Sequence, residues 1–469
     1  MIRIQMIRQS DLGAAAAACV ILALVTLSPL PFGGVLPRER VLIDVGAFVA
    51  LALVVAGRHE LGDLRPAARP ALALAAVGAW GILQSLPWPR FLVGLVAPPM
   101  VGVWTTAPTP EALVGWGIPL SLAPEVSRAT GLHWLALAGA LAAAGVVGRY
   151  RQLTRLVGLG LAAVTVLEIV YGLGKWFEQS STIWGVEVGG ELRLRGTFVN
   201  PDHFATFLLI PLAVSFAWAW WSLRRAMQTS SLERRLLYLT IPWLVFLLVF
   251  VALAFTGSRG GLVGALMVLV VQTVLLAVHY RRWQAALVGA GAVLMGFAGV
   301  FFFGFQSGLG RWLGTSAYEL TWNLRIELYQ ATLELWRRFP LTGTGLGTFR
   351  QAFPRVQPAN LDLTWIHAHS DVLEILVTAG PLALLVLAVA FFGLFATLRD
   401  GFTFGRRSED RAVSLAAAGA VAGVAAHSFV DFGLTLPANA LILAVLVGLA
   451  CGSPRHRPAD LSAAPTGGS

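Results

Sequence analysis

Charged side chains are scarce in this chain: Asp, Glu, Lys and Arg make up only 12% of 469 residues, whereas hydrophobic residues make up 57%. A soluble globular protein carries roughly 25% charged residues. The composition therefore excludes an ordinary soluble domain and indicates an integral membrane protein. Cysteine is also scarce, since Cys19 and Cys451 are the only two, and both lie in apolar runs. Cysteines in apolar runs typically behave as small buried apolar residues, and these two give no indication of a disulfide framework or a metal centre.

The sequence is rich in long apolar runs. Windows of about 19 apolar residues predict an all-α polytopic membrane protein with twelve spans in a single domain over residues 1–452. The first run is longer than a typical signal-peptide core of about 7–15 residues, so it too is predicted as a span. The predicted spans are 12–31, 40–56, 71–87, 130–148, 154–176, 203–222, 236–255, 261–279, 284–305, 372–398, 412–430 and 436–452.

Lysine is nearly absent, because Lys175 is the only lysine among 34 basic residues. The arginines gather in alternate connections between the predicted spans, which is the positive-inside pattern. Both termini are therefore predicted to be cytoplasmic, with loops 88–128, 178–202 and 306–370 on the outer side of an inner membrane. The net charge of +10 is accounted for by this topology, and nucleic-acid binding is not expected.

The loop 306–370 is long enough to be a functional insertion. Residues 323–339 within it are predicted to form an amphipathic helix on the membrane surface or over a cavity, with Leu324, Leu328, Leu335 and Trp336 on one side. The segment 340–347 that follows is rich in glycine and turn-forming. The tail 453–469 is rich in Pro, Ala and Gly and is predicted to be disordered and cytoplasmic.

Two polar clusters precede predicted spans on the outer side. In the segment 193–203, Asn200 and Pro201 suit a helix cap and a first turn, which leaves Arg195 and His203 without a structural explanation. The segment 256–261 reads Thr-Gly-Ser-Arg-Gly-Gly, a tight turn that suits an anion beside a helix N-terminus. Its Arg259 could instead extend toward lipid phosphates.

Two further clusters belong to the long loop. Arg325 and Tyr329 are one turn apart on the amphipathic segment, where a solvated charge is the simpler interpretation. His367 and His369 directly precede a predicted span. A pair of this spacing could bind a metal, but no carboxylate-rich set accompanies it, and no metal is expected. A capping box of Asp371 with Glu374 would account for both acids and leaves the histidines unexplained.

A third pair, His427 and Asp431, is spaced i, i+4 near the outer end of the eleventh predicted span. Ionisable residues within a span are functional candidates by default. A structural role with Asn439 or with a neighbouring helix is an equal alternative. Taken together, outer arginines and a histidine beside glycine-rich turns suggest a site for a diphosphate, because guanidinium groups match phosphate geometry and keep their charge.

These polar segments, in their order along the chain, resemble those of the superfamily of O-antigen ligases and O-antigen polymerases. The resemblance covers about residues 120–400 and includes Ser121–Pro124. The chain departs from the family pattern at Asp202, where a second Asn is frequent, and at Ser370-Asp371, where His-Asn is frequent. The matching segments are 195–202, 256–261, Arg325 followed by 340–347, and 367–374 with Gly380.

The resemblance implies a membrane glycosyltransferase with a GT-C-like fold. Such an enzyme takes a glycan from an undecaprenyl-diphosphate carrier on the periplasmic side of the bacterial inner membrane and joins it to a sugar hydroxyl, without metal or cofactor. By motif position, Arg259 and Arg325 would bind the diphosphate and His369 would be the base. Supporting roles in substrate binding fall to Arg195, Asn200, His203, Tyr329, His367 and Asp371.

The acceptor is not encoded in any motif. A glycan, a lipid A-core acceptor and a protein acceptor all remain open, and so does the choice between ligase and polymerase. The alternative from another class is a transporter or flippase with twelve spans that moves the same lipid-linked glycan. The long outer loop and the clustering of polar residues on one side, away from the midplane, favour the glycosyltransferase.

Overall fold

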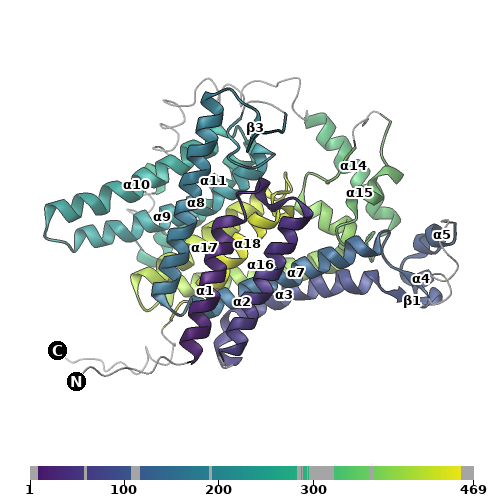
Figure 1. Ribbon diagram of the computed structural model, residues 1–469, viewed down its shortest axis with the longest axis horizontal. Coiled ribbons are helices and arrows are strands. Elements are labelled where there is room, and N and C mark those ends of the chain that lie inside the picture. The colour runs from purple at the N-terminus through teal and green to yellow at the C-terminus, as the bar shows by residue number, and fades with distance from the viewer. Residues whose placement is uncertain are drawn as a thin grey trace.

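The computed structural model describes residues 9–57, 61–106, 117–189, 193–281, 287, 289–292, 294, 322–359, 361 and 364–455. These residues form helices joined by irregular segments, with two small two-stranded antiparallel sheets in the described part, β1 paired with β2 and β3 with β4 (Figure 1). The elements are α1 (Gln9–Leu27), η1 (Phe32–Gly34), α2 (Pro37–Ala56), α3 (Leu61–Ser85), β1 (Pro87–Trp88), α4 (Arg90–Val96), α5 (Pro98–Thr106), β2 (Ile118–Pro119), α7 (Pro124–Val147), α8 (Arg151–Phe177), β3 (Thr182–Ile183), β4 (Val186–Glu187), α9 (Pro201–Met227), α10 (Leu232–Phe255), α11 (Arg259–Tyr280), α14 (Trp322–Arg338), α15 (Phe349–Ala352), η3 (Phe353–Arg355), α16 (Asp371–Phe404), α17 (Ser408–His427), η4 (Gly433–Thr435) and α18 (Pro437–Gly452).

Seven helices of the described part are long and apolar enough to cross a membrane: α1, α7, α8, α9, α10, α11 and α16. The prediction of a mostly helical membrane protein is confirmed. Each predicted span within the described residues coincides with a helix, whereas the span predicted at 284–305 and the loop residues 306–321 lie largely outside them. The number twelve and the GT-C-like arrangement stay predictions.

Several helices extend beyond their predicted bounds. α7 begins at Pro124 instead of residue 130, and α16 runs to Phe404 instead of residue 398. Hydropathy windows locate only the apolar part of a helix, whereas α7 starts with a proline and Glu125 in its first turn, which suit a helix N-terminus.

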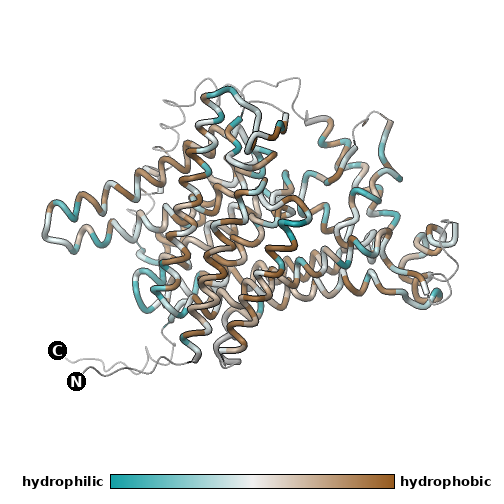
Figure 2. The backbone as a smooth tube through the Cα atoms, viewed as in Figure 1, coloured by the Kyte–Doolittle hydropathy of each residue, from teal (hydrophilic) through white to brown (hydrophobic). Residues whose placement is uncertain are grey.

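α9 lies in the middle of the main core, where it packs against α10, α17, α11, α8 and α18. Its most apolar window is 83% buried, against 28% for that of α16, so α9 is surrounded by protein and α16 presents much of its apolar surface outward. Figure 2 shows hydrophobic residues along much of the helical bundle, as expected in a lipid environment.

A second core lies under the long outer loop. Leu328 and Leu335 of α14 are fully buried there, together with Phe349, Phe353 and Met100. The predicted amphipathic helix is thus confirmed as α14, which packs against η3 and α16. This packing fixes α14 over the start of α16.

The helix α16 is broken at Gly380, whose φ is 83° and ψ 171°. Pro381 follows and has no N–H, so carbonyl groups before the break lose their helical donors. The freed groups are bound from outside: Trp80 Nε1 donates to Ala379 O at 2.8 Å, and Gly345 N donates to Thr378 O at 2.9 Å. The part of α16 before the break is therefore anchored by α3 and by the glycine-rich turn.

The glycine-rich turn 340–347 therefore serves to pack closely against α16. Gly343, Gly345 and Gly347 all have positive φ, and a Cβ at Gly343 would lie 2.5 Å from the backbone carbon of Thr378. Buried Gln84 donates to Thr342 O at 2.7 Å and accepts from Leu346 N at 2.9 Å. These contacts require glycine at close approach to α16.

A buried carboxylate on α8 fixes the loop before α9. Glu168 is fully buried and accepts from the Thr197 backbone N–H and hydroxyl, both at 2.7 Å. Gly196, with φ 55°, packs directly on this carboxylate, so that a Cβ there would collide with it. Glu168, absent from the candidate residues of the sequence, thus orders the segment that carries Arg195.

We expect Glu168→Ala to destabilise the fold by about 1–3 kcal/mol, because the buried N–H of Thr197 loses its acceptor. The Thr197 hydroxyl can still donate to Pro29 O, 3.0 Å away. Thermal unfolding of the purified protein, followed by tryptophan fluorescence, measures the change. The control is Glu178→Ala at the exposed end of the same helix, where little change is expected. Equal unfolding temperatures for the two variants would contradict the assignment.

Candidate functional site

The start of α9 is capped as predicted. Asn200 Oδ1 accepts from Asp202 N at 2.8 Å, and Pro201 is the first helical residue. Arg193, which the sequence did not single out, pairs with Asp202 at 2.6 Å, and its Nε donates to Thr256 O at 2.5 Å. Arg193 therefore ties the entrance of α9 to the turn before α11.

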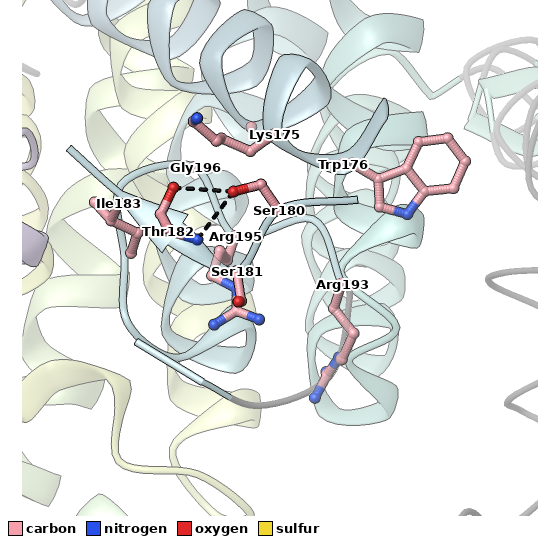
Figure 3. Close-up of a pocket in the computed structure, with 10 residues that line it drawn as sticks. Lys175, Trp176, Ser180, Ser181, Thr182, Ile183, Arg193, Arg195 and Gly196 are labelled. Atoms are coloured by element: carbon pink, nitrogen blue, oxygen red, sulfur yellow. Dashed lines mark hydrogen bonds between the residues drawn. The ribbon is translucent and has the colours of Figure 1, made fainter. Parts of the chain in front are cut away.

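Arg195 lies in a small pocket at the end of α8, beside the β3–β4 hairpin (Figure 3). Its guanidinium donates to Gly189 O at 2.8 Å and to Val199 O at 3.3 Å. Lys175 and Arg193 line the same pocket. Arg195 therefore orders its own loop and adds to a concentration of positive charge.

The turn before α11 brings Arg259 to a helix N-terminus. Ser258 caps the helix by accepting from Gly261 N at 3.1 Å, after Gly257 with φ 65°. Arg259 is the first residue of α11, and a Cβ on its neighbour Gly260 would lie 2.6 Å from the His427 ring. The glycine lets this turn pack directly against His427.

The two candidate residues on α14, Arg325 and Tyr329, form hydrogen bonds to two other segments of the chain. Arg325 NH1 donates to Val430 O at 2.8 Å, and the Tyr329 hydroxyl donates to His369 O at 2.9 Å. Both side chains are half-buried. The interpretation of Arg325 as a solvated charge is therefore wrong, because the helix is held against the core beneath it.

The start of α16 differs from the predicted capping box. Ser370 is the cap and accepts from Leu373 N at 3.3 Å. Glu374 accepts from Ala368 N at 3.0 Å and pairs with His367 Nδ1 at 2.9 Å. Glu374 forms an ion pair with His367 in place of the predicted capping box, because a charge-assisted hydrogen bond is the stronger interaction.

Asp371 links α16 to the segment after α17. Its carboxylate accepts from the Ser428 hydroxyl at 2.8 Å and from Leu434 N at 3.2 Å, while its N–H donates to Asp431 O at 3.0 Å. Asp371 is buried, so it serves as an internal tie and does not face a substrate cavity.

Phe432 is the centre on which the histidines converge. Its ring centroid lies 4.4 Å from that of His203, 4.4 Å from that of His367 and 4.7 Å from that of His369. His367 stacks on the ring at 22°, whereas His203 and His369 approach edge-on. Three imidazoles from two distant segments are thus brought together on one aromatic surface.

The two loop histidines have opposite electrostatics. Burial lowers the pKa of His369 to about 4, against the opposing charge of Asp431, so its imidazole is neutral near pH 7. Burial also acts to lower the pKa of His367, but the Glu374 carboxylate outweighs it and raises that pKa above the ordinary value. The pair therefore combines a neutral imidazole with one that holds its proton more firmly.

His427 and Asp431 lie beneath this cluster and are buried. His427 Nδ1 is 3.0 Å from the Thr206 hydroxyl, and its Nε2 is 3.6 Å from Asp431 Oδ2. Asn439 does not join this pair, since its amide donates to His203 O and Gly433 O, each at 3.0 Å. The predicted alternative of a contact with a neighbouring helix is confirmed, through Thr206 on α9.

The structure thus brings together His203, His367, His369, Arg325 and Tyr329 around the 428–432 segment. Asn200 and Asp371 serve as cap and tie. Phe432 was missed by the sequence analysis because a phenylalanine next to an apolar helix carries no visible mark of function. The partnership of Glu374 with His367 was missed because capping gave the acid a sufficient role.

A comparison with protein families matches one segment of the chain. Residues 244–388 match the family model described as O-antigen ligase. The match includes Arg259, Arg325, His367 and His369, whereas the segment 193–203 lies outside it. No curated protein matches the chain. This matched segment, less than a third of the chain, is what is similar to O-antigen ligases.

Proposed function

We propose that the protein is a metal-independent glycosyltransferase that moves a glycan from undecaprenyl diphosphate to a sugar hydroxyl on the periplasmic face of the inner membrane. The observation that carries this proposal is the convergence of His203, His367 and His369 on Phe432, with Arg325 anchored beside them at Val430. The superfamily match supports a role in joining cell-surface glycans.

The donor diphosphate would be bound by arginines. Arg259 stands at the N-terminus of α11, where helix N–H groups and the helix dipole favour an anion. Arg325 approaches the same histidine cluster from α14. Guanidinium groups at these two places would stabilise the negative charge that develops on the leaving undecaprenyl diphosphate as the sugar–phosphate bond breaks.

The acceptor would be activated by His369. Among the described residues, neither ring nitrogen of His369 has a hydrogen-bonding partner, whereas Nδ1 of His367 is held by Glu374. A neutral imidazole can take the proton of the acceptor hydroxyl as its oxygen bonds to the anomeric carbon. An anionic donor beside His369 would raise its pKa and make it a better base.

The alternative is a transporter or flippase for the same lipid-linked glycan. A transporter of this kind would place its polar groups near the middle of the membrane. Here the histidine cluster lies where the starts of α9 and α16 meet the end of α17. This position at helix ends favours group transfer, and both a lipid A-core and a growing glycan remain as acceptors.

The glycan profile of a deletion strain tests the proposed function. Loss of a ligase should leave unmodified lipid A-core together with long, carrier-linked polymer. Loss of a polymerase should leave a single repeat on the core. Accumulation of unflipped, cytoplasmic lipid-linked glycan would identify the transporter and overturn the proposal. Purified protein should also release undecaprenyl diphosphate from a lipid-linked donor when acceptor is present.

We expect Arg259→Ala to abolish transfer, because the developing diphosphate charge loses its fork of N–H donors. Arg259→Lys should restore only part of the activity, since an ammonium provides charge without a bidentate fork. Turnover of purified protein is the measurement. Arg337→Ala on α14, where the arginine is exposed, is the matched control and should keep normal turnover. Normal turnover of Arg259→Ala would exclude the role.

His369 needs a substitution that respects its backbone. Its φ of 51° is left-handed, so Ala would add strain, whereas Asn tolerates this conformation. We expect His369→Asn to reduce turnover by about 10²–10⁴-fold, with unchanged donor affinity. His367→Ala should cost much less, because Glu374 already holds that imidazole.

Two results would contradict the role of His369. Equal losses for the two histidine variants would indicate a shared structural role around Phe432. Loss of activity with a chelator, followed by recovery with added zinc or manganese, would show that the histidines are metal ligands and that the proposed metal-free mechanism is wrong.

A further inference from the structure

A groove with a volume of about 400 Å³ opens between α8, α9, α17 and α18. It lies at the C-terminal end of α9, away from the His203 end of that helix. Its walls are mostly apolar, and the charged residues of its lining are Arg151, Arg155, Glu409 and Asp410. The apolar lining includes Val157, Leu161, Trp218, Val413, Val445 and Leu446.

A second pocket, of about 210 Å³, lies at the same end of α9. Its lining contains four arginines and no acid; the lining residues are Arg224, Arg225, Gln228, Arg406, Ser408 and Arg411. Two of the arginines are fixed in place: Arg224 donates to the Tyr280 hydroxyl, and Arg411 Nε donates to Gly405 O at 3.0 Å. The pocket is therefore an organised cluster of positive charge.

The groove and the pocket meet at Trp221. This residue lines the groove, and its Nε1 donates to Ser408 Oγ, in the wall of the pocket, at 3.1 Å. The Arg225 guanidinium lies over the Trp221 ring, 5.3 Å from its centroid. The apolar groove therefore adjoins the cationic pocket.

Glu409, an acid that lies close to one pocket arginine, does not cancel the charge of the pocket. Glu409 is paired with Arg151 and, at 2.6 Å, with Arg155, both from α8. Arg225 is more distant from Glu409, at 3.9 Å. Two arginines outside the pocket already neutralise this carboxylate, so the pocket retains a positive charge that an anion could balance.

We propose that the groove and the pocket together bind one anionic phospholipid of the surrounding bilayer, with an acyl chain in the groove and the phosphate among Arg224, Arg225, Arg406 and Arg411. Guanidinium groups match a phosphodiester, and basic pockets between membrane helices suit anionic headgroups. A free phosphate would occupy the pocket and leave the groove unused. This site is separate from the proposed donor site at the other end of α9.

Two variants test the two halves of the site. Arg225→Gln with Arg406→Gln removes two charges from the pocket, and Arg234→Gln with Arg235→Gln is the matched control on the exposed start of α10. Gly158→Phe fills the groove, because a Cβ at this groove-lining residue meets nothing within 4 Å. Gly174→Phe is its control, since this glycine is on the same helix, equally open and outside the groove.

The measurement is retention of phosphatidylglycerol against phosphatidylcholine by the detergent-purified full-length protein, followed by native mass spectrometry. Wild type and both controls should retain phosphatidylglycerol preferentially. Each pocket arginine should contribute roughly fivefold in affinity, so the double variant should lose about 25-fold. Gly158→Phe should lose binding without any change in charge.

Three outcomes would overturn the proposal. The first is no preference of the wild type for phosphatidylglycerol, and the second is equal losses for the pocket variant and for its α10 control. The third is full displacement of the lipid by millimolar inorganic phosphate together with normal binding by Gly158→Phe. That combination would identify a simple anion pocket.

Discussion

The join between the start of α16 and the segment after α17 is the contact on which the candidate site depends. Asp371 bonds Asp431 through its backbone and Ser428 through its side chain, and the Ser370 hydroxyl donates to Ser428 O at 3.2 Å. Because Phe432 follows directly, this join sets its ring between the two histidines that precede α16 and His203 in the first turn of α9. Arg325 of α14 completes this set of contacts by donating a hydrogen bond to Val430 O.

These bonds are buried, and burial raises their importance. A buried polar group that loses its partner costs about 1–3 kcal/mol, so the polar side chains at this join support each other and resist partial opening. The imidazoles can therefore keep fixed positions on Phe432. Preorganisation of this kind is what electrostatic stabilisation of a leaving group requires.

Much of the fold could be predicted from the sequence, because apolar runs and caps are local features. Asn200 and the amphipathic helix of the long loop were identified from a few adjacent residues. The contacts that build the site are not local: His427 reaches Thr206 across 221 positions, and Gln84 reaches Thr342 across 258. No pattern in one segment encodes such a partner. Glu168, Glu374 and Phe432 acquire their roles only from neighbours that the tertiary fold supplies.

The break at Gly380 divides α16 into two segments. The first segment is held by hydrogen bonds from Trp80 and from the glycine-rich turn, whereas the second has exposed apolar residues such as Leu385, Val389 and Phe392. Because the two segments meet at this break and do not form one continuous helix, the contacts that fix the segment after the histidines are separate from the apolar surface that the second segment exposes.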